Sequence, residues 1–319
     1  MRSFILFLLP LLDIFLAPFV VIAAWIFKLT RRVGVQRLPI CKRILLFVGV
    51  FPIRNHYYEP LFDPTELRTP LSDERSLPGI DLNIGGQLSL LAAFRYEGEL
   101  SGLVGEKTDD LTFHFDNEAF RSGDAEYLYN LIRLKKPRRI YEIGSGNSTL
   151  MAIKATAKNV ADVPGYCCEH VCVEPYEMPW LERTGVSVVR QRVQDLPLAF
   201  FAALEKGDLL FIDSTHMIRP QGDVLYEYLQ LLPTLAAGVI VHVHDIFTPR
   251  DYLASWVIGE VKFWNEQYLL EALLSGTKSW KVIGALNYLK HNHYSELKAT
   301  CPFLTMDREP GSFYIEKMI

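Results

Sequence analysis

The longest apolar run of the chain lies at its beginning. Residues 4–27 are apolar except for Asp13 and are long enough to cross a bilayer as a helix. Pro10 and Pro18 would kink such a helix, which membrane helices tolerate. The flank that follows, residues 28–43, is basic and holds no acidic residue. Under the positive-inside rule, this charge distribution predicts a single-pass membrane anchor with the rest of the chain in the cytoplasm.

Two other interpretations of this segment stay open. Val21-Ile22-Ala23 resembles a signal-peptide cleavage site, although the apolar run is long for a signal peptide and the basic flank follows it instead of preceding it. Asp13, between two prolines, fits poorly at the centre of a bilayer, which is compatible with a helix or hairpin lying in the membrane surface. We predict a transmembrane anchor over residues 1–30, with its basic flank continuing to residue 43.

Residues 44–121 show no long regular period. The apolar run at 44–53 is too short to span a bilayer. Residues 60–105 are rich in proline and turn residues around one helical run at 87–96. The aromatic content of this region is too high for a disordered linker, so we predict an irregular N-terminal cap.

Short apolar runs alternate with helical runs from residue 122 onward. The expected helices cover residues 124–134, 148–158, 225–235 and, as one long amphipathic helix, 252–275. The expected strands cover residues 139–143, 170–174, 186–190, 208–213, 238–244, 280–285 and 312–316. This alternation predicts an α/β domain over 122–319, with a mostly parallel seven-stranded sheet between two layers of helices. The Pro310-Gly311 turn predicts that the last strand returns antiparallel.

The first expected strand leads into a turn with two glycines, Gly144 and Gly146. Glycine lets the backbone turn sharply and lets a ligand approach closely. Asn147 or Ser148 can cap the next helix, whose free N–H groups then face the space above the turn. This pattern is typical of a nucleotide-type site. The dinucleotide fingerprint needs glycine or alanine three residues after Gly146, where this chain has Thr149.

Acidic residues stand at the ends of four expected strands: Glu142, Glu174, Asp213 and Asp245. In an open parallel sheet the carboxyl ends of the strands share one edge, and ligands bind there. A carboxylate after the second strand can accept both hydroxyls of a ribose, and Glu174 has this position. From position alone, an exposed glutamate without function fits equally well.

The charge and the cysteine content of the chain bear on whether it binds nucleic acid or zinc. The formal net charge of −4 gives no electrostatic reason to expect nucleic acid. The five cysteines are Cys41, Cys167, Cys168, Cys172 and Cys301. Their spacing lacks the second pair that a zinc site needs, so we expect reduced thiols.

From about residue 113 to residue 319, the chain resembles the class I S-adenosylmethionine (SAM)-dependent methyltransferases, close to the methyltransferase-24 and small-molecule O-methyltransferase group. Four motifs at strand ends carry the resemblance: Glu142–Thr149, Val173–Pro175, Phe211–His216 and Val243–Phe247. The resemblance implies a Rossmann-like sheet and SAM as the cofactor. It also implies the residues that bind SAM: Glu142 and the turn Gly144, Ser145, Gly146, Asn147 and Ser148, with Glu174 at the ribose and Gln194 and Asp195 near the adenine.

On the acceptor side, the resemblance implies a catalytic set of Asp213, His216 and Asp245. Metal-dependent members hold a divalent cation on two aspartates and an asparagine, with a lysine as base. Asp213 and Asp245 match the aspartates, whereas Ile246 stands at the asparagine position and His216 at the lysine position. Histidine titrates in the range that suits a base, and the two carboxylates could still hold Mg²⁺ with waters.

These observations predict an enzyme that moves a methyl group from SAM to a hydroxyl of a small-molecule, sugar or lipid-linked acceptor at the membrane. Two alternatives remain: an NAD(P)-dependent Rossmann oxidoreductase, disfavoured by Thr149, and a non-catalytic, membrane-tethered binding protein of the same fold. The identity of the acceptor and the oligomeric state do not follow from the sequence.

Overall fold

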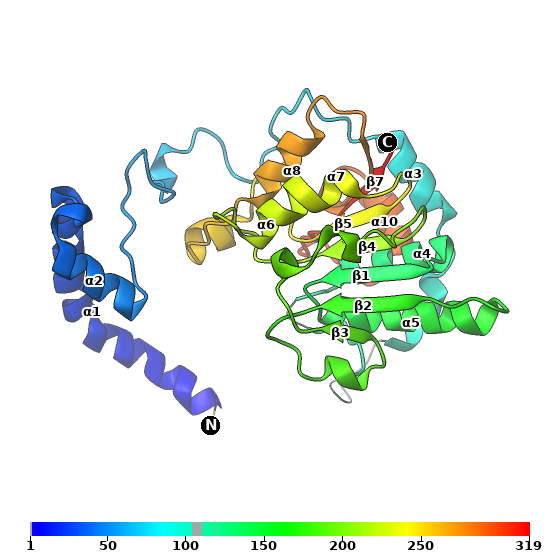
Figure 1. The fold of residues 1–319 in the computed structure, drawn as a ribbon, viewed down its shortest axis with the longest axis horizontal. Coiled ribbons are helices and arrows are strands. Elements are labelled where there is room, and N and C mark those ends of the chain that lie inside the picture. The colour runs from blue at the N-terminus through cyan, green and yellow to red at the C-terminus, as the bar shows by residue number, and fades with distance from the viewer. Residues whose placement is uncertain (1, 104–108, 110, 118) are drawn as a thin grey trace. The chain divides into compact units, whose positions relative to one another are not determined.

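The computed structural model describes residues 2–103, 109, 111–117 and 119–319 of the chain. The chain divides into two units, Met1–Arg68 and Thr69–Ile319, shown from blue to red in Figure 1. The region predicted as one cap, residues 44–121, is therefore divided between the units. A few of its residues, Gly105 among them, lie outside the described part of the chain.

The first unit contains helix α1 (Arg2–Val33), the short 3₁₀ helix η1 (Val35–Arg37) and helix α2 (Pro39–Val48). Within α1, residues Leu8–Val33 have a mean hydropathy of 2.2 and are long and apolar enough to cross a membrane. Pro10 and Pro18 lie inside this helix, as the sequence predicted. A signal sequence near the N-terminus would meet the same criteria of length and composition, so both the membrane anchor and its orientation stay predictions.

The second unit is built on one seven-stranded sheet with the order β3-β2-β1-β4-β5-β7-β6. The strands are β1 (Arg139–Ile143), β2 (Glu169–Val173), β3 (Ser187–Val189), β4 (Leu209–Ile212), β5 (Ile240–Val243), β6 (Trp280–Ala285) and β7 (Phe313–Lys317). The first five run parallel, and β7 pairs antiparallel with both β5 and β6. This confirms the predicted fold class, including the antiparallel last strand.

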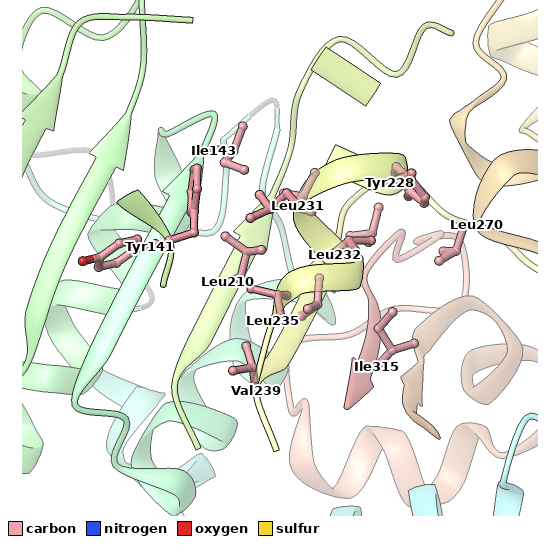
Figure 2. Close-up of a cluster of buried hydrophobic side chains, with 14 of the residues drawn as sticks. Tyr141, Ile143, Leu210, Tyr228, Leu231, Leu232, Leu235, Val239, Leu270 and Ile315 are labelled. Atoms are coloured by element: carbon pink, nitrogen blue, oxygen red, sulfur yellow. The ribbon is translucent and has the colours of Figure 1, made fainter. Parts of the chain in front are cut away.

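The central strands are buried on both faces, because alternate residues point to opposite sides. Ile140 and Phe211 pack toward one core, against α4 (Asp124–Lys135) and α5 (Asn147–Asp162). Tyr141 and Leu210 pack toward the other core, with Leu231, Leu232 and Leu235 from the helical segment after β4 (Figure 2). This burial on both faces explains why the strand sequences are almost continuously apolar.

The remaining helices differ from the sequence expectation in length and number. The run expected at 225–235 is a continuous helical stretch of α6 (Asp223–Tyr226), a π turn η7 (Glu227–Leu231) and α7 (Leu232–Thr234). The run expected at 87–96 is α3 (Ile84–Ala93). Two short helices that we did not predict, α9 (Leu286–Asn292) and α10 (Tyr294–Thr300), follow β6.

The long helix predicted over 252–275 was wrong. The structure has a π turn η8 (Ser255–Gly259), a non-helical stretch, and then α8 (Glu266–Leu274). The break occurs because the N–H groups of Asn265 and Glu266 donate to the carbonyl of His216, 3.0 and 3.2 Å away, instead of to carbonyls of the preceding turn. Val261, at φ 57°, also departs from helical geometry. Tertiary hydrogen bonds thus override the apolar periodicity.

Candidate active site

The acidic strand ends lie along one edge of the sheet. Ile143 pairs with Val173 on one side and with Ile212 on the other, and Ile212 pairs with Val243. The residues that follow these four strands therefore emerge side by side. They include Gly144, Glu174, Asp213 and the segment His244–Asp245.

The glycine turn is fixed by the neighbouring strands. The N–H of Gly144 donates to the carbonyl of Val173 at 3.1 Å, and its φ of 78° lies in the left-handed region. A Cβ at this position would lie 1.9 Å from the carbonyl oxygen of Asp213, so a side chain has no room here. At Gly146 the nearest atom to a Cβ would be 3.7 Å away, which leaves that side of the turn open.

Glu142 lies beneath the turn and is almost fully buried. Its carboxylate accepts hydrogen bonds from Ser148 Oγ at 2.9 Å and Thr149 Oγ1 at 3.1 Å, and it also contacts His170 Nε2. Thr149 Oγ1 in turn accepts from the N–H of Gly146 at 3.1 Å. The threonine that replaces the third glycine thus joins the turn to the start of α5. The structure places Glu142 as support for the turn.

The turn borders a cavity of about 350 Å³ at the ends of β1, β2 and β4. Four of the predicted site residues line it: Gly144, Glu174, Gln194 and Asp213. The other lining residues are Ile143, Val173, Pro175, Tyr176, Glu177, Arg192, Val193, Ser214, Thr215, Arg219 and Asp223. Ser145, Asn147 and Ser148 belong to the adjoining turn and helix start, and Ser145 Oγ is buried without a hydrogen-bond partner among the described residues.

Glu174 has one carboxylate oxygen held by the backbone. Oε1 accepts from the N–H groups of Tyr176 and Glu177, at 3.0 and 2.9 Å. This fixes the side chain at the cavity and leaves Oε2 for a ligand hydroxyl. Asp195, by contrast, is paired with Arg192 at 2.8 Å and borders a separate hollow of about 940 Å³, which Gln194 also lines.

Beside the cavity, His216 lies among three carboxylates. Its Nε2 is 3.2 Å from Asp213 Oδ1 and 3.6 Å from Asp245 Oδ2, and its Nδ1 is 2.8 Å from Glu266 Oε2. The centre of the Trp264 ring lies 4.3 Å from that of the imidazole. The structure therefore brings the three predicted catalytic residues together. His216 and Asp245 both have a positive φ, 58° and 57°.

These contacts set the ionisation states. Burial opposes the charged form of His216, but Asp213 and Glu266 outweigh it and raise its pKa well above the ordinary value. Burial likewise opposes ionisation of Asp213, but His244 and His216 lower its pKa to about 2. For Asp245 burial prevails, and its pKa is raised. Because its pKa is raised, His216 is already protonated near neutral pH. An imidazolium has no free lone pair, so in this form the histidine that was predicted as the base cannot accept a proton.

Two members of this cluster, Glu266 and Trp264, were not predicted from the sequence. Glu266 is fully buried and also accepts from the Tyr228 hydroxyl at 2.9 Å. Both residues were hidden inside the wrongly predicted long helix. No local pattern in the sequence marks Glu266 as buried, because glutamate is almost never fully buried unless it is paired, and its partner His216 lies 50 residues away.

The possible cation ligands Asp213 and Asp245 both face His216 Nε2, and the ligand atoms of the three residues lie within 4.8 Å of one another. The proton on Nε2 already supplies positive charge between the carboxylates. A divalent cation at this point would need His216 in its neutral form, since a metal binds the free lone pair. Mg²⁺ therefore stays a prediction.

Comparisons with known proteins bear on the same part of the chain. Residues 141–246 match a family model described as a methyltransferase domain. An uncharacterized protein of Archaeoglobus fulgidus is 29% identical over 188 residues, covering 52% of this chain and 83% of that protein. The segment matched by the family model runs from β1 to just beyond β5 and contains the glycine turn and all four acidic strand ends.

Two solved structures also align with the chain. The O-methyltransferase from Bacillus cereus in complex with SAH is 14% identical, with a TM-score of 0.36, covering 72% of this chain and 99% of that one. The plantazolicin methyltransferase BpumL, in complex with a triazolic desmethylPZN analog and SAH, is 12% identical, with a TM-score of 0.37, covering 75% and 97%.

Proposed function

Residues 141–246 match a methyltransferase domain, and from this premise we propose that the chain is a class I SAM-dependent methyltransferase that methylates a hydroxyl of a small-molecule, sugar or lipid-linked acceptor at a membrane. One observation carries the proposal. The cavity between Gly144, Glu174 and Asp213 adjoins a cluster of acid–base side chains at the same sheet edge. The apolar helix α1 supports the membrane as the place of action.

On the cofactor side, we assign the cavity to SAM. Glu174 Oε2 would accept the ribose hydroxyls, and Val193 and Gln194 would border the adenine. The methionine part would lie toward Ser145, Gly146 and the start of α5, where unpaired N–H groups favour a carboxylate.

On the acceptor side, we assign the role of base to Asp245. Bound SAM would supply the methyl group, its carbon–sulfur bond breaking with the electron pair going to sulfur, and the Asp245 carboxylate would take the proton of the attacking hydroxyl. A raised pKa makes Asp245 a better proton acceptor than Asp213. His216 orients both carboxylates, and alignment of oxygen, methyl and sulfur supplies much of the rate.

A first experiment separates the three functional classes by ligand binding. The full chain is unfolded thermally with SAM, SAH or NAD⁺, each at a hundredfold excess over an expected dissociation constant, which stabilises by about 2.7 kcal/mol. Stabilisation by SAM and SAH is expected. Stabilisation by NAD⁺ alone would favour an oxidoreductase and contradict the proposal.

A second experiment tests transfer. Membranes and soluble extract from cells lacking the protein are incubated with the full chain and methyl-labelled SAM, and label is followed into the lipid, glycan and small-molecule fractions. We expect label in one fraction, and its loss with Asp245→Asn while SAH binding persists. Binding of SAH without label in any fraction would favour a tethered binding protein instead.

A further inference from the structure

The first unit contains a hollow of its own, of about 680 Å³, beside the last turns of α1. It is lined by Ala24, Phe27, Lys28, Arg32, Pro52, Ile53, Arg54 and Asn55. The four residues from α1 follow a spacing of three and four, so they form one face of the helix. Apolar side chains thus come first along this face, and two cations follow toward its end.

A partly buried ion-pair network holds the other wall of this hollow against α1. Glu59 Oε1 lies 2.8 Å from Arg31 on α1 and 2.9 Å from Arg54. Burial opposes ionisation of Glu59, but the N–H of Arg54 and the two guanidinium groups lower its pKa to about 2. Glu59 is therefore an anion at any physiological pH, and its two ion pairs connect Arg54, on the other wall of the hollow, to α1.

Positive charge in this hollow exceeds negative charge. Three of its lining residues are basic and none is acidic, and residues 28–58 contain no aspartate or glutamate. Lys28 and Arg32 are exposed, and within the described residues neither forms an ion pair. Arg54 shares a single carboxylate with Arg31. The hollow is therefore suited to an amphipathic anion, whose charged group would face the basic residues and whose apolar part would contact the apolar lining.

Two features indicate that such a ligand comes from a membrane surface. Trp25, whose ring lies 5.0 Å from Lys28 Nζ, is 66% exposed, as is typical of aromatic residues at the level of lipid headgroups. In α2, the residues Ile40, Ile44, Phe47 and Val48 form one exposed apolar stripe, with Phe47 at 90% exposure. A short helix with such a stripe and basic neighbours lies in the membrane interface.

We propose that this hollow binds the headgroup of an anionic phospholipid, with its phosphate facing Lys28, Arg32 and Arg54. The acyl chains would continue along Ala24 and Phe27 toward the apolar part of α1. This site is independent of methyl transfer, so its failure would leave the proposed enzymatic function unaffected. It would hold the enzyme in membrane regions rich in anionic lipid.

The test uses the full chain, purified in detergent and freed of lipid, with lipid adducts counted by native mass spectrometry. It is titrated with dioleoyl-phosphatidylglycerol and with dioleoyl-phosphatidylcholine. We expect tighter binding of the anionic lipid. The double substitution Lys28→Gln and Arg32→Gln should weaken it about 30-fold, because each cation near a headgroup contributes about fivefold.

Two matched variants make the result specific. Arg37→Gln with Arg43→Gln removes the same charge outside the hollow and should weaken binding less than about threefold. Lys28→Arg with Arg32→Lys keeps the charge and should keep the affinity. The proposal would be overturned if the two glutamine double variants lost the same affinity for the anionic lipid. A full loss of affinity in the charge-preserving variant would overturn it too. Competition by inorganic phosphate at equal concentration would point to a free anion and overturn it as well.

Discussion

The two sides of the candidate active site are built differently. On the turn side, most polar groups find partners close in sequence: Glu174 accepts from residues two and three further on, and Glu142, which also contacts His170, accepts from Ser148 and Thr149. On the histidine side, Asp213 is only three residues from His216, but the other partners come from far along the chain. His216 pairs with Glu266, 50 residues away, and Glu266 pairs with Tyr228, 38 residues away.

The two sides are therefore suited to different tasks, ligand recognition on the turn side and acid–base chemistry on the histidine side. The turn side presents backbone and a carboxylate at fixed positions, which is what recognition of a ligand with a constant shape needs. The histidine side places ionisable groups where burial and neighbouring charge change their pKa values in opposite directions. Such divergence of two carboxylates is the general way in which a site assigns separate acid–base roles. Substitutions on the two sides should therefore fail in different ways.

The largest effect is expected from Gly144→Ala on the turn side. The new methyl group would meet the Asp213 carbonyl, in a backbone conformation that alanine avoids. Strain and overpacking together should cost about 3 kcal/mol or more of unfolding free energy. SAH binding should be lost at the same time. Denaturant unfolding and calorimetric titration measure both.

A matched glycine shows whether geometry is the cause. Gly85, in α3, has an ordinary φ, and no atom lies within 4 Å of the place that an added methyl group would take. Gly85→Ala should therefore change stability by less than about 1 kcal/mol. A similar loss in both variants would contradict the role given to the turn.

A smaller effect, of about 2 kcal/mol, is expected from Glu266→Gln on the histidine side, because it removes the charge from a buried hydrogen bond while keeping the shape of the side chain. His216 has a raised pKa, so its pairing stabilises the fold fully below the unfolded value of about 6.5 and loses this effect as pH rises through the folded value. The destabilisation should thus be largest below about pH 6.5 and shrink as the pH rises through the folded pKa of His216.

The exposed glutamate of the same segment serves as the control for that substitution. Glu260 pairs with Lys262 at 3.0 Å on the surface. Glu260→Gln should change the unfolding free energy by less than about 0.5 kcal/mol at every pH. A Glu266→Gln destabilisation that does not vary with pH would show that Glu266 fills space without interacting with a charged His216.

Glu174→Gln should affect the ligand more than the fold. Oε1 of Glu174 already accepts from the backbone, so in the glutamine variant the group that faces the ribose would be an NH₂ group, which cannot accept a hydrogen bond. We expect the affinity for SAM and SAH to fall about tenfold, the effect of one lost charge-assisted hydrogen bond. Thermal stability without ligand should stay close to that of the unmodified protein. An unchanged SAH affinity in calorimetric titration would remove Glu174 from the proposed ribose site.

The smallest effect is expected from metal chelation. If the imidazolium of His216 supplies the charge between Asp213 and Asp245, EDTA should change the rate of label transfer less than about twofold, which corresponds to about 0.4 kcal/mol. Recovery of a lost rate by Mg²⁺ would instead assign the two carboxylates to a cation, as the resemblance allowed.

The same contrast explains what could be predicted from the sequence. Strands, their acidic ends and the glycine turn depend on local periodicity and on residues within a few positions, and the fold class followed from them. The break before Glu266 depends on the carbonyl of His216, which only the folded chain brings near. Periodicity alone joined residues 252–275 into one helix, and the cluster partner inside it was missed.

The place of β7 in the sheet has a consequence for the order of assembly during translation. β6 contacts the sheet through β7, which separates it from β5, yet β6 is synthesised first. Until residue 317 has emerged from the ribosome, Trp280 and Val282 have no strand to pair with. A growing chain therefore exposes this apolar strand until its C-terminal end has been made, and a chaperone that shields apolar segments would bind it there.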